Sequence, residues 1–174
     1  YITFLDQDDV FNLKCIENRI NKFFENDNIN LVISDYLENN QIKNCSKIHK
    51  MENFASNFKE EICKSPGPFF QCCMFKRELF DDINFLFDKK AIPSEDWDFF
   101  INLSSSKLNI GYVQSPDFIW NFSEDSQSAN YEKEAVGLHY ILKKHKNIFL
   151  NQIGKIGLSE HYRMVARVYE KGNL

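Results

Sequence analysis

The chain begins with a short apolar run that ends in a cluster of carboxylates. Tyr1 to Leu5 is rich in β-branched and aromatic residues, which predicts a buried strand, and the Asp6-Gln7-Asp8-Asp9 sequence predicts a polar turn at its carboxyl end. In open α/β sheets, ligands bind at that end of the strands. Three carboxylates within four positions repel one another, so a cation or a ligand's protons would stabilise them. A solvated acidic turn is the alternative interpretation of the same residues.

The composition predicts one domain with a substantial core. The 174 residues are 43% hydrophobic and 15% aromatic, and the 17 Phe residues would be the main core filler. A net charge of −4 gives no reason to expect a nucleic-acid partner. The five cysteines, with Cys72 and Cys73 adjacent, suit free thiols in a reducing cytoplasm. Since no apolar run is as long as a membrane span, we expect a cytoplasmic protein.

Hydrophobic periodicity predicts alternating helices and strands. Leu13, Ile16, Ile20 and Phe23 recur at helical spacing, which predicts a helix that ends near Glu25. We further expect strands at 31–36, 71–75 and 109–113, helices at 52–63, 76–82 and from Ser94 onward, a polar loop at 39–50, and two amphipathic helices at 131–171 broken near Gly154.

A second acidic group, Ser94-Glu95-Asp96-Trp97-Asp98, opens one of the expected helices. Ser94 is a suitable N-cap, and the acids that follow favour the positive end of the helix dipole. One of these carboxylates would make a general base if the helix start borders a pocket. Trp97 could offer a flat apolar face to a sugar ring. A well-capped helix with a core Trp explains the same residues, so the motif alone leaves both interpretations open.

The order of these motifs resembles the second half of an inverting family 2 glycosyltransferase with the GT-A fold. YITFLDQDD is similar to the strand that carries the metal- and diphosphate-binding Asp-x-Asp of that family, and LVISDY resembles the next strand. MFKRELF resembles the segment that lines the acceptor side, and SEDWDFF the Glu-Asp motif whose Asp is the catalytic base. Trp120 to Ser128 lies where the family has a flexible loop that closes over the donor.

The resemblance implies an α/β fold: part of a Rossmann-like GT-A mixed sheet flanked by helices, with a helical carboxyl-terminal tail. Residues 1–128 would form the second half of the catalytic domain, and residues 129–174 a helical extension packed on the same domain. In the family, a first half with the nucleotide base and ribose pockets precedes the Asp-x-Asp strand. We therefore expect this half of the domain to be encoded upstream of Tyr1.

The resemblance also implies roles for individual residues. Asp6 and Asp8 would bind Mn²⁺ or Mg²⁺ and the ribose-diphosphate, with Asp9 in support. Asp96 would deprotonate the acceptor hydroxyl, which places its carboxylate about 8–12 Å from that of Asp8 across an open pocket. The residues expected on the acceptor side are Glu95, Trp97 and Met74.

The implied reaction moves one sugar, with inversion, from a nucleotide-diphosphate donor to a glycan or lipid-linked acceptor. The family resemblance suggests bacterial surface polysaccharide or lipopolysaccharide assembly. A lipid-linked acceptor would bring the enzyme into peripheral contact with the inner face of the membrane, where the basic Lys143 to Lys146 segment could meet anionic head groups.

Two alternatives remain open from the sequence. An apolar strand followed by Asp-x-Asp-x-Val also resembles the first motif of haloacid-dehalogenase-type phosphatases, in which the first Asp is a nucleophile and the second an acid. Those enzymes need a later Gly-Asp-x-x-x-Asp pair, whereas the later acidic cluster here follows Pro93 and lacks the Gly. The second alternative is a non-catalytic fragment that keeps the glycosyltransferase scaffold.

Overall fold

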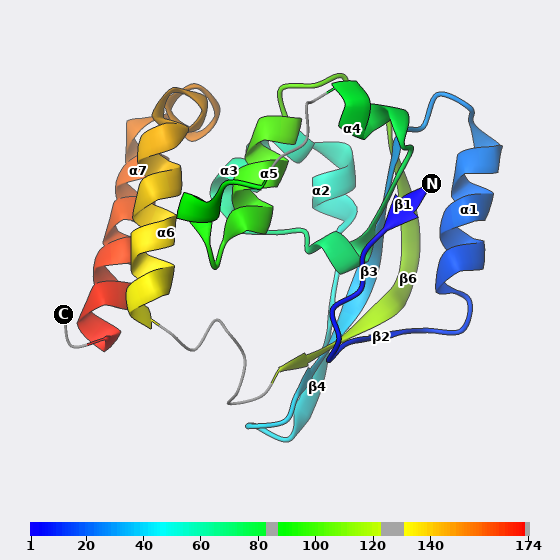
Figure 1. Cartoon of the computed structure of the whole chain (residues 1–174), viewed down its shortest axis with the longest axis horizontal. Helices are drawn as coiled ribbons and strands as arrows, with labels where there is room; N and C mark the ends of the chain where they lie inside the picture. Colours follow the sequence, from blue (N-terminus) through cyan, green and yellow to red (C-terminus); the bar gives the residue numbers. More distant parts are fainter. Residues whose placement is uncertain (83–86, 123–130, 173–174) are drawn as a thin grey trace. The chain divides into compact units, whose positions relative to one another are not determined.

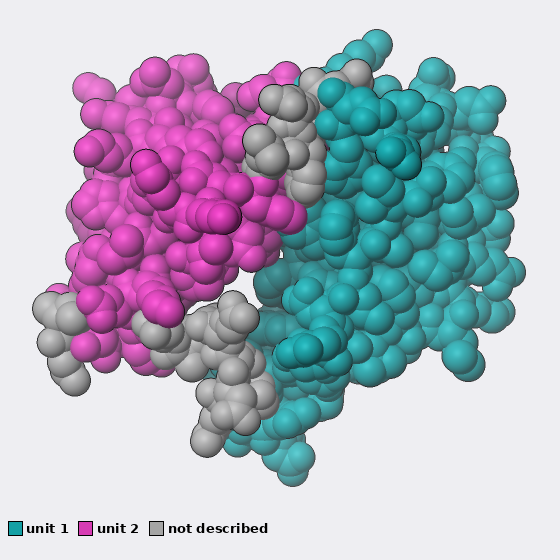
Figure 2. All heavy atoms as spheres, in the orientation of Figure 1, with its two compact units in different colours: residues 1–58, 68–85, 106–124 teal, residues 59–67, 86–105, 125–174 magenta. Residues whose placement is uncertain are grey.

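The computed structural model of the chain describes residues 1–82, 87–122 and 131–172 (Figure 1). Figure 2 colours its two compact units. Residues 1–58, 68–85 and 106–124 form unit 1, and residues 59–67, 86–105 and 125–174 form unit 2. Unit 1 holds the β-sheet, whereas the regular structure described in unit 2 is helical. The expected α/β class is confirmed.

A mixed six-stranded sheet is the framework of unit 1. Its order is β1-β5-β3-β6-β2, with β4 pairing to β3 beside this path. Its strands are β1 (Ile2–Thr3), β2 (Val10–Phe11), β3 (Leu31–Asn40), β4 (Cys45–His49), β5 (Cys73–Phe75) and β6 (Ile110–Phe122). The two longest strands, β3 and β6, run parallel, and all the other pairs are antiparallel.

Helices α1 (Cys15–Glu25) and α2 (Glu52–Ser56) contact β3 and β6 and lie on opposite faces of the sheet (Figure 1). Phe23 of α1 packs with Ile29, Val32 and Met74 in a buried cluster on one face. Burying apolar side chains on both faces of the central strands stabilises such a sheet. Unit 1 also contains η1 (Phe70–Cys72) and α4 (Glu78–Asp82).

Unit 2 is built around three helices: α5 (Glu95–Leu103), α6 (Tyr131–Lys144) and α7 (Lys146–Lys171). The short helix η2 (Lys89–Ala91) contacts both α5 and α6, and α6 packs along α7. Most of α3 (Phe58–Lys64) also belongs to this unit. Across the described residues, no helix is both long enough and apolar enough to cross a membrane.

Several expected elements are confirmed, and some differ at their ends. α1 and α5 form where the periodicity predicts helices, although Ser94 makes no capping hydrogen bond with its side chain at the start of α5. The tail breaks at His145 between α6 and α7, and α7 is kinked at Gly154, whose φ of 68° favours glycine. The division of the chain at residue 128 into a catalytic part and an extension stays a prediction.

Three sequence expectations were wrong. The polar stretch expected as a loop at 39–50 forms the hairpin of β3 and β4, because Asn44 adopts a φ of 48° that asparagine tolerates in a tight turn. The helix expected at 52–63 is divided into α2 and α3 at Asn57. The strand expected from Tyr1 to Leu5 is reduced to Ile2–Thr3 at the sheet edge, with Tyr1 55% exposed.

Candidate functional site

The acidic turn of unit 1 joins β1 to β2. The backbone N–H of Asp9 donates to the carbonyl of Asp6 at 3.2 Å, which closes the turn. Strand β2 then pairs with β6, with Val10 opposite Ile119. This pairing holds the turn beside the carboxyl end of β6, which runs parallel to β3. The expected position of the carboxylates, at the carboxyl edge of parallel strands, is therefore observed.

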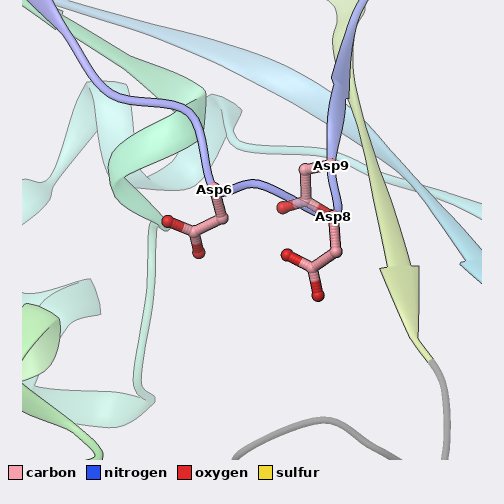
Figure 3. A group of neighbouring side chains, drawn as sticks. All are labelled: Asp6, Asp8 and Asp9. Carbon is pink, nitrogen blue, oxygen red and sulfur yellow. The ribbon is translucent and has the colours of Figure 1, made fainter.

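The three carboxylates of this turn lie close together. One carboxylate oxygen from each of Asp6, Asp8 and Asp9 lies within 4.8 Å of the other two. In Figure 3 the carboxylates of Asp8 and Asp9 turn toward the side on which Asp6 lies, while the Asp6 carboxylate extends away from them in this view. Asp6 and Asp8 are exposed, whereas Asp9 is 8% exposed. Because the segment is a turn and not a strand, Asp9 joins its two neighbours instead of pointing to the opposite face.

The electrostatics of the turn disfavour three simultaneous negative charges. Although the Asp6 residue is exposed, its carboxyl group is partly surrounded by protein, and this partial burial raises its pKa. The charge of Asp8 raises the pKa further, while a hydrogen bond from Gln71 lowers it in part. Burial raises the pKa of Asp9 to about 6, against the lowering effect of the Asn121 backbone N–H. A cation among these oxygens would relieve this repulsion.

Neighbouring amides hold the acidic turn in place. The Gln71 side-chain amide donates to Asp6 Oδ2 at 2.5 Å. The Asn121 backbone N–H donates to Asp9 Oδ1 at 2.9 Å, and its side chain donates to the Asp8 carbonyl at 2.8 Å. Asn39, on β3, donates to Asn121 Oδ1 at 2.9 Å. Strands β3 and β6 thus fix one side of the turn, and η1 fixes the other.

These amides were not among the residues that the sequence motifs predicted for the site. Gln71 could have been found from its place as the single amide in an otherwise apolar run, Pro68-Phe69-Phe70-Gln71-Cys72-Cys73. Such a run predicts burial, and a buried polar side chain needs a hydrogen-bond partner. Asn39 and Asn121 could be linked only through the register of β3 and β6, which places them opposite each other.

The second acidic group lies at the start of α5 in unit 2. Asp96 is half-buried, and its Oδ1 accepts the backbone N–H of Trp97 at 2.7 Å. Glu95 Oε2 is buried and has no hydrogen-bond partner among the described residues. Asp98 is 2% exposed and is bonded by His145 at 2.7 Å and Lys144 at 2.8 Å. Asp98 therefore has a structural role.

Two residues expected on the acceptor side lie in hydrophobic cores. Trp97 has no exposed surface, and its Nε1 donates to the Ile62 carbonyl at 2.7 Å. Met74 is 2% exposed and packs against Phe23. Neither side chain offers a surface to a ligand, so the acceptor site proposed below does not include them.

The expected closing loop is described only in part. Trp120 is half-buried at the end of β6, where its ring lies 5.1 Å from that of Phe69, centroid to centroid. Residues 123–128 of the expected loop, including Ser126, Gln127 and Ser128, lie outside the described residues. The expected distance between Asp96 and Asp8, which belong to different units, stays a prediction.

The arrangement offers hard oxygen ligands on an anchored turn, which is the ligand chemistry that Mn²⁺ and Mg²⁺ prefer. In comparisons with known proteins, no family model matches the chain and no curated protein matches it.

Proposed function

We propose that this chain is part of a metal-dependent inverting glycosyltransferase that uses a nucleotide-diphosphate sugar. The observation that carries the proposal is the convergence of one carboxylate oxygen each from Asp6, Asp8 and Asp9 within 4.8 Å. The order of motifs in the sequence, which resembles the second half of a GT-A catalytic domain of family 2, supports the same function.

The chemistry of the acidic turn fits a divalent cation. All the candidate ligands are carboxylate oxygens, and two of the three acids, Asp6 and Asp8, are exposed to incoming solutes. Asp6 and Asp8 would hold Mn²⁺ or Mg²⁺, while Asp9, fixed by the Asn121 backbone N–H, keeps the turn in shape. When bound, the cation neutralises negative charge on the leaving diphosphate.

Asp96 is the proposed general base. The family resemblance gives this role to Asp96, whose Oδ1 accepts the Trp97 backbone N–H, whereas Asp98 is bonded to His145 and Lys144. Asp96 would take the proton of the acceptor hydroxyl as that oxygen attacks the anomeric carbon, opposite the leaving group, so that one displacement inverts the centre. Glu95 would orient the acceptor.

The proposed acceptor is a glycan or a lipid-linked sugar, and the proposed process is assembly of a bacterial surface polysaccharide. The enzyme would act in the cytoplasm, at the inner face of the membrane. These proposals rest on the sequence resemblance.

The direct test measures release of nucleoside diphosphate from a panel of nucleotide sugars by the protein that contains this chain. We expect release in Mn²⁺ and none after chelation with EDTA. Asp96→Asn should abolish transfer and leave donor binding nearly unchanged, while Asp81→Asn, at an exposed position on α4, is the matched control.

Release of phosphate from a phosphomonoester without sugar transfer would instead support the phosphatase alternative. Donor binding without turnover would support a non-catalytic scaffold.

A further inference from the structure

A buried arginine is connected to the acidic turn through Gln71. Arg19 of α1 has no exposed surface, and hydrogen bonds to its two terminal nitrogens offset part of the cost of burying a guanidinium. Nη1 donates to Thr3 Oγ1 at 3.2 Å and to the Cys73 carbonyl at 3.3 Å. Nη2 donates to Ser34 Oγ at 2.9 Å and to the Gln71 carbonyl at 2.7 Å. Arg19 therefore joins β1, β3, β5 and η1 around one side chain.

The Gln71 contact connects this buried charge to the candidate site. Arg19 fixes the backbone of Gln71 at its carbonyl, and the side-chain amide of the same residue donates to Asp6 Oδ2 at 2.5 Å. Gln71 is itself 7% exposed, so the surrounding side chains restrict the rotamers that its side chain can adopt. The exposed carboxylate of Asp6 is thus held from the interior of unit 1, through two consecutive hydrogen bonds.

We infer that Gln71, held by Arg19, is a positioning residue that orients the Asp6 carboxylate for binding a divalent cation. This inference rests on the proposed function. An exposed Asp side chain loses rotational freedom when it ligates a metal, and a fixed hydrogen bond reduces that loss before the metal arrives. The bond to Oδ2 leaves lone pairs on the carboxylate for the cation, because each carboxylate oxygen can accept more than one contact.

A purely structural role for Gln71 makes a different prediction. In that case Gln71 would stabilise the fold without affecting the metal, and its loss would resemble the loss of any other buried contact of Arg19. Ser34 provides this comparison, because its hydroxyl accepts from Arg19 Nη2 and donates to the Cys72 carbonyl at 3.2 Å, both away from Asp6. Ser34→Ala removes buried hydrogen bonds of the same network and leaves the Gln71 amide in place.

The test is Mn²⁺ titration followed by the electron paramagnetic resonance signal of free Mn²⁺, with thermal unfolding of each variant recorded in parallel. Gln71→Met keeps the length of the side chain and removes the donor. We expect it to weaken Mn²⁺ binding roughly tenfold, the usual effect of losing a hydrogen bond to a metal ligand. Ser34→Ala should lower the melting temperature with unchanged Mn²⁺ affinity. In an Asp6→Asn background, Gln71→Met should have no further effect, because it acts through Asp6.

Each outcome separates the two proposals. A wild-type protein that binds no Mn²⁺ overturns the proposed metal site, and this inference with it. Wild-type Mn²⁺ binding with equal affinity in Gln71→Met overturns the inference alone, as does equal weakening in Gln71→Met and Ser34→Ala. If Gln71→Met does not fold, Gln71→Asn carries the same prediction, since its side chain remains a polar amide but is too short to reach Asp6, and the backbone carbonyl that accepts from Arg19 is unchanged.

Discussion

At the scale of single residues, two buried aspartates show opposite electrostatic settings. Burial tends to raise the pKa of Asp98, but hydrogen bonds from His145 and Lys144 outweigh it and hold the pKa below its ordinary value. Asp9 instead lies beside two further carboxylates, and its pKa rises to about 6. The ionised carboxylate of Asp98 therefore stabilises the folded state. Ionisation of Asp9 instead reduces the free energy of unfolding.

Asp98→Asn should strongly destabilise the protein. The change leaves Lys144 and the buried His145 without their shared carboxylate, a loss that costs about 3 kcal/mol in comparable buried pairs. The free energy of unfolding in urea measures it, with Asp81→Asn as the exposed control. Because the folded pKa of Asp98 is lowered, its contribution is present at neutral pH and is lost as the pH falls through that value. A variant as stable as the wild type at neutral pH would contradict this role.

Mn²⁺ affinity should rise between about pH 5 and about pH 7, because Asp9 loses its proton in this range and a carboxylate attracts the cation. The same raised pKa means that the metal-free protein gains stability from Asp9 as the pH falls through about 6. Isothermal titration with Mn²⁺ at several pH values measures the first effect. In Asp9→Asn, which can still accept the Asn121 backbone N–H, the pH dependence should flatten. An equal slope in both proteins would refute the assignment.

At the scale of elements, close backbone approach explains one glycine in a helix. A Cβ at Gly137 in α6 would lie 2.8 Å from the Ala91 carbonyl oxygen and 3.0 Å from that of Ile92. Both atoms are backbone, so η2 and the residue after it would have to shift. Helix α6 packs against η2 in unit 2 because position 137 has no side chain.

Gly137→Ala should therefore reduce stability, even though alanine is the better helix former by about 1 kcal/mol. Overpacking against a backbone costs about 1–3 kcal/mol, which exceeds this gain. Urea unfolding measures the difference, and Val136→Ala on the exposed side of the same helix is the control, expected to change stability little. A Gly137→Ala protein more stable than the wild type would contradict this account, because it would mean that α6 and η2 can move apart at little cost.

Local patterns predicted the helices better than the strands. The 3.6-residue spacing around Ile16 and Phe23 and the acidic start at Glu95 located α1 and α5. The sequence of β4 does not alternate between apolar and polar residues, and four of its five residues are exposed in the structure. Its existence as a strand depends on its pairing with β3, which local sequence does not reveal. The acidic turn was visible as a sequence cluster, whereas its supports, Gln71 and Asn121, are brought to it only by folding.

At the scale of the whole molecule, the residues to which we assign roles in the proposed reaction are divided between the two units. Unit 1 presents an anchored carboxylate turn suited to a cation and a diphosphate, and unit 2 carries Asp96 at the start of α5. Unit 2 also contains a hollow of about 620 Å³ bordered by Lys89, Lys90 and Lys133. We propose that the acidic turn of unit 1 binds a diphosphate through a divalent cation.

The most direct test of that claim is calorimetric titration of nucleoside diphosphates into the protein that contains this chain, with and without Mn²⁺, in the wild type and in Asp8→Asn. We expect at least one nucleoside diphosphate to bind in the presence of Mn²⁺ and to lose most of its affinity after chelation. It should bind Asp8→Asn at least roughly tenfold more weakly, because losing one metal ligand weakens the binding of the cation and, through it, of the diphosphate. Nucleoside diphosphate binding that is unchanged by chelation and by Asp8→Asn would contradict the account, as would no binding by any nucleoside diphosphate.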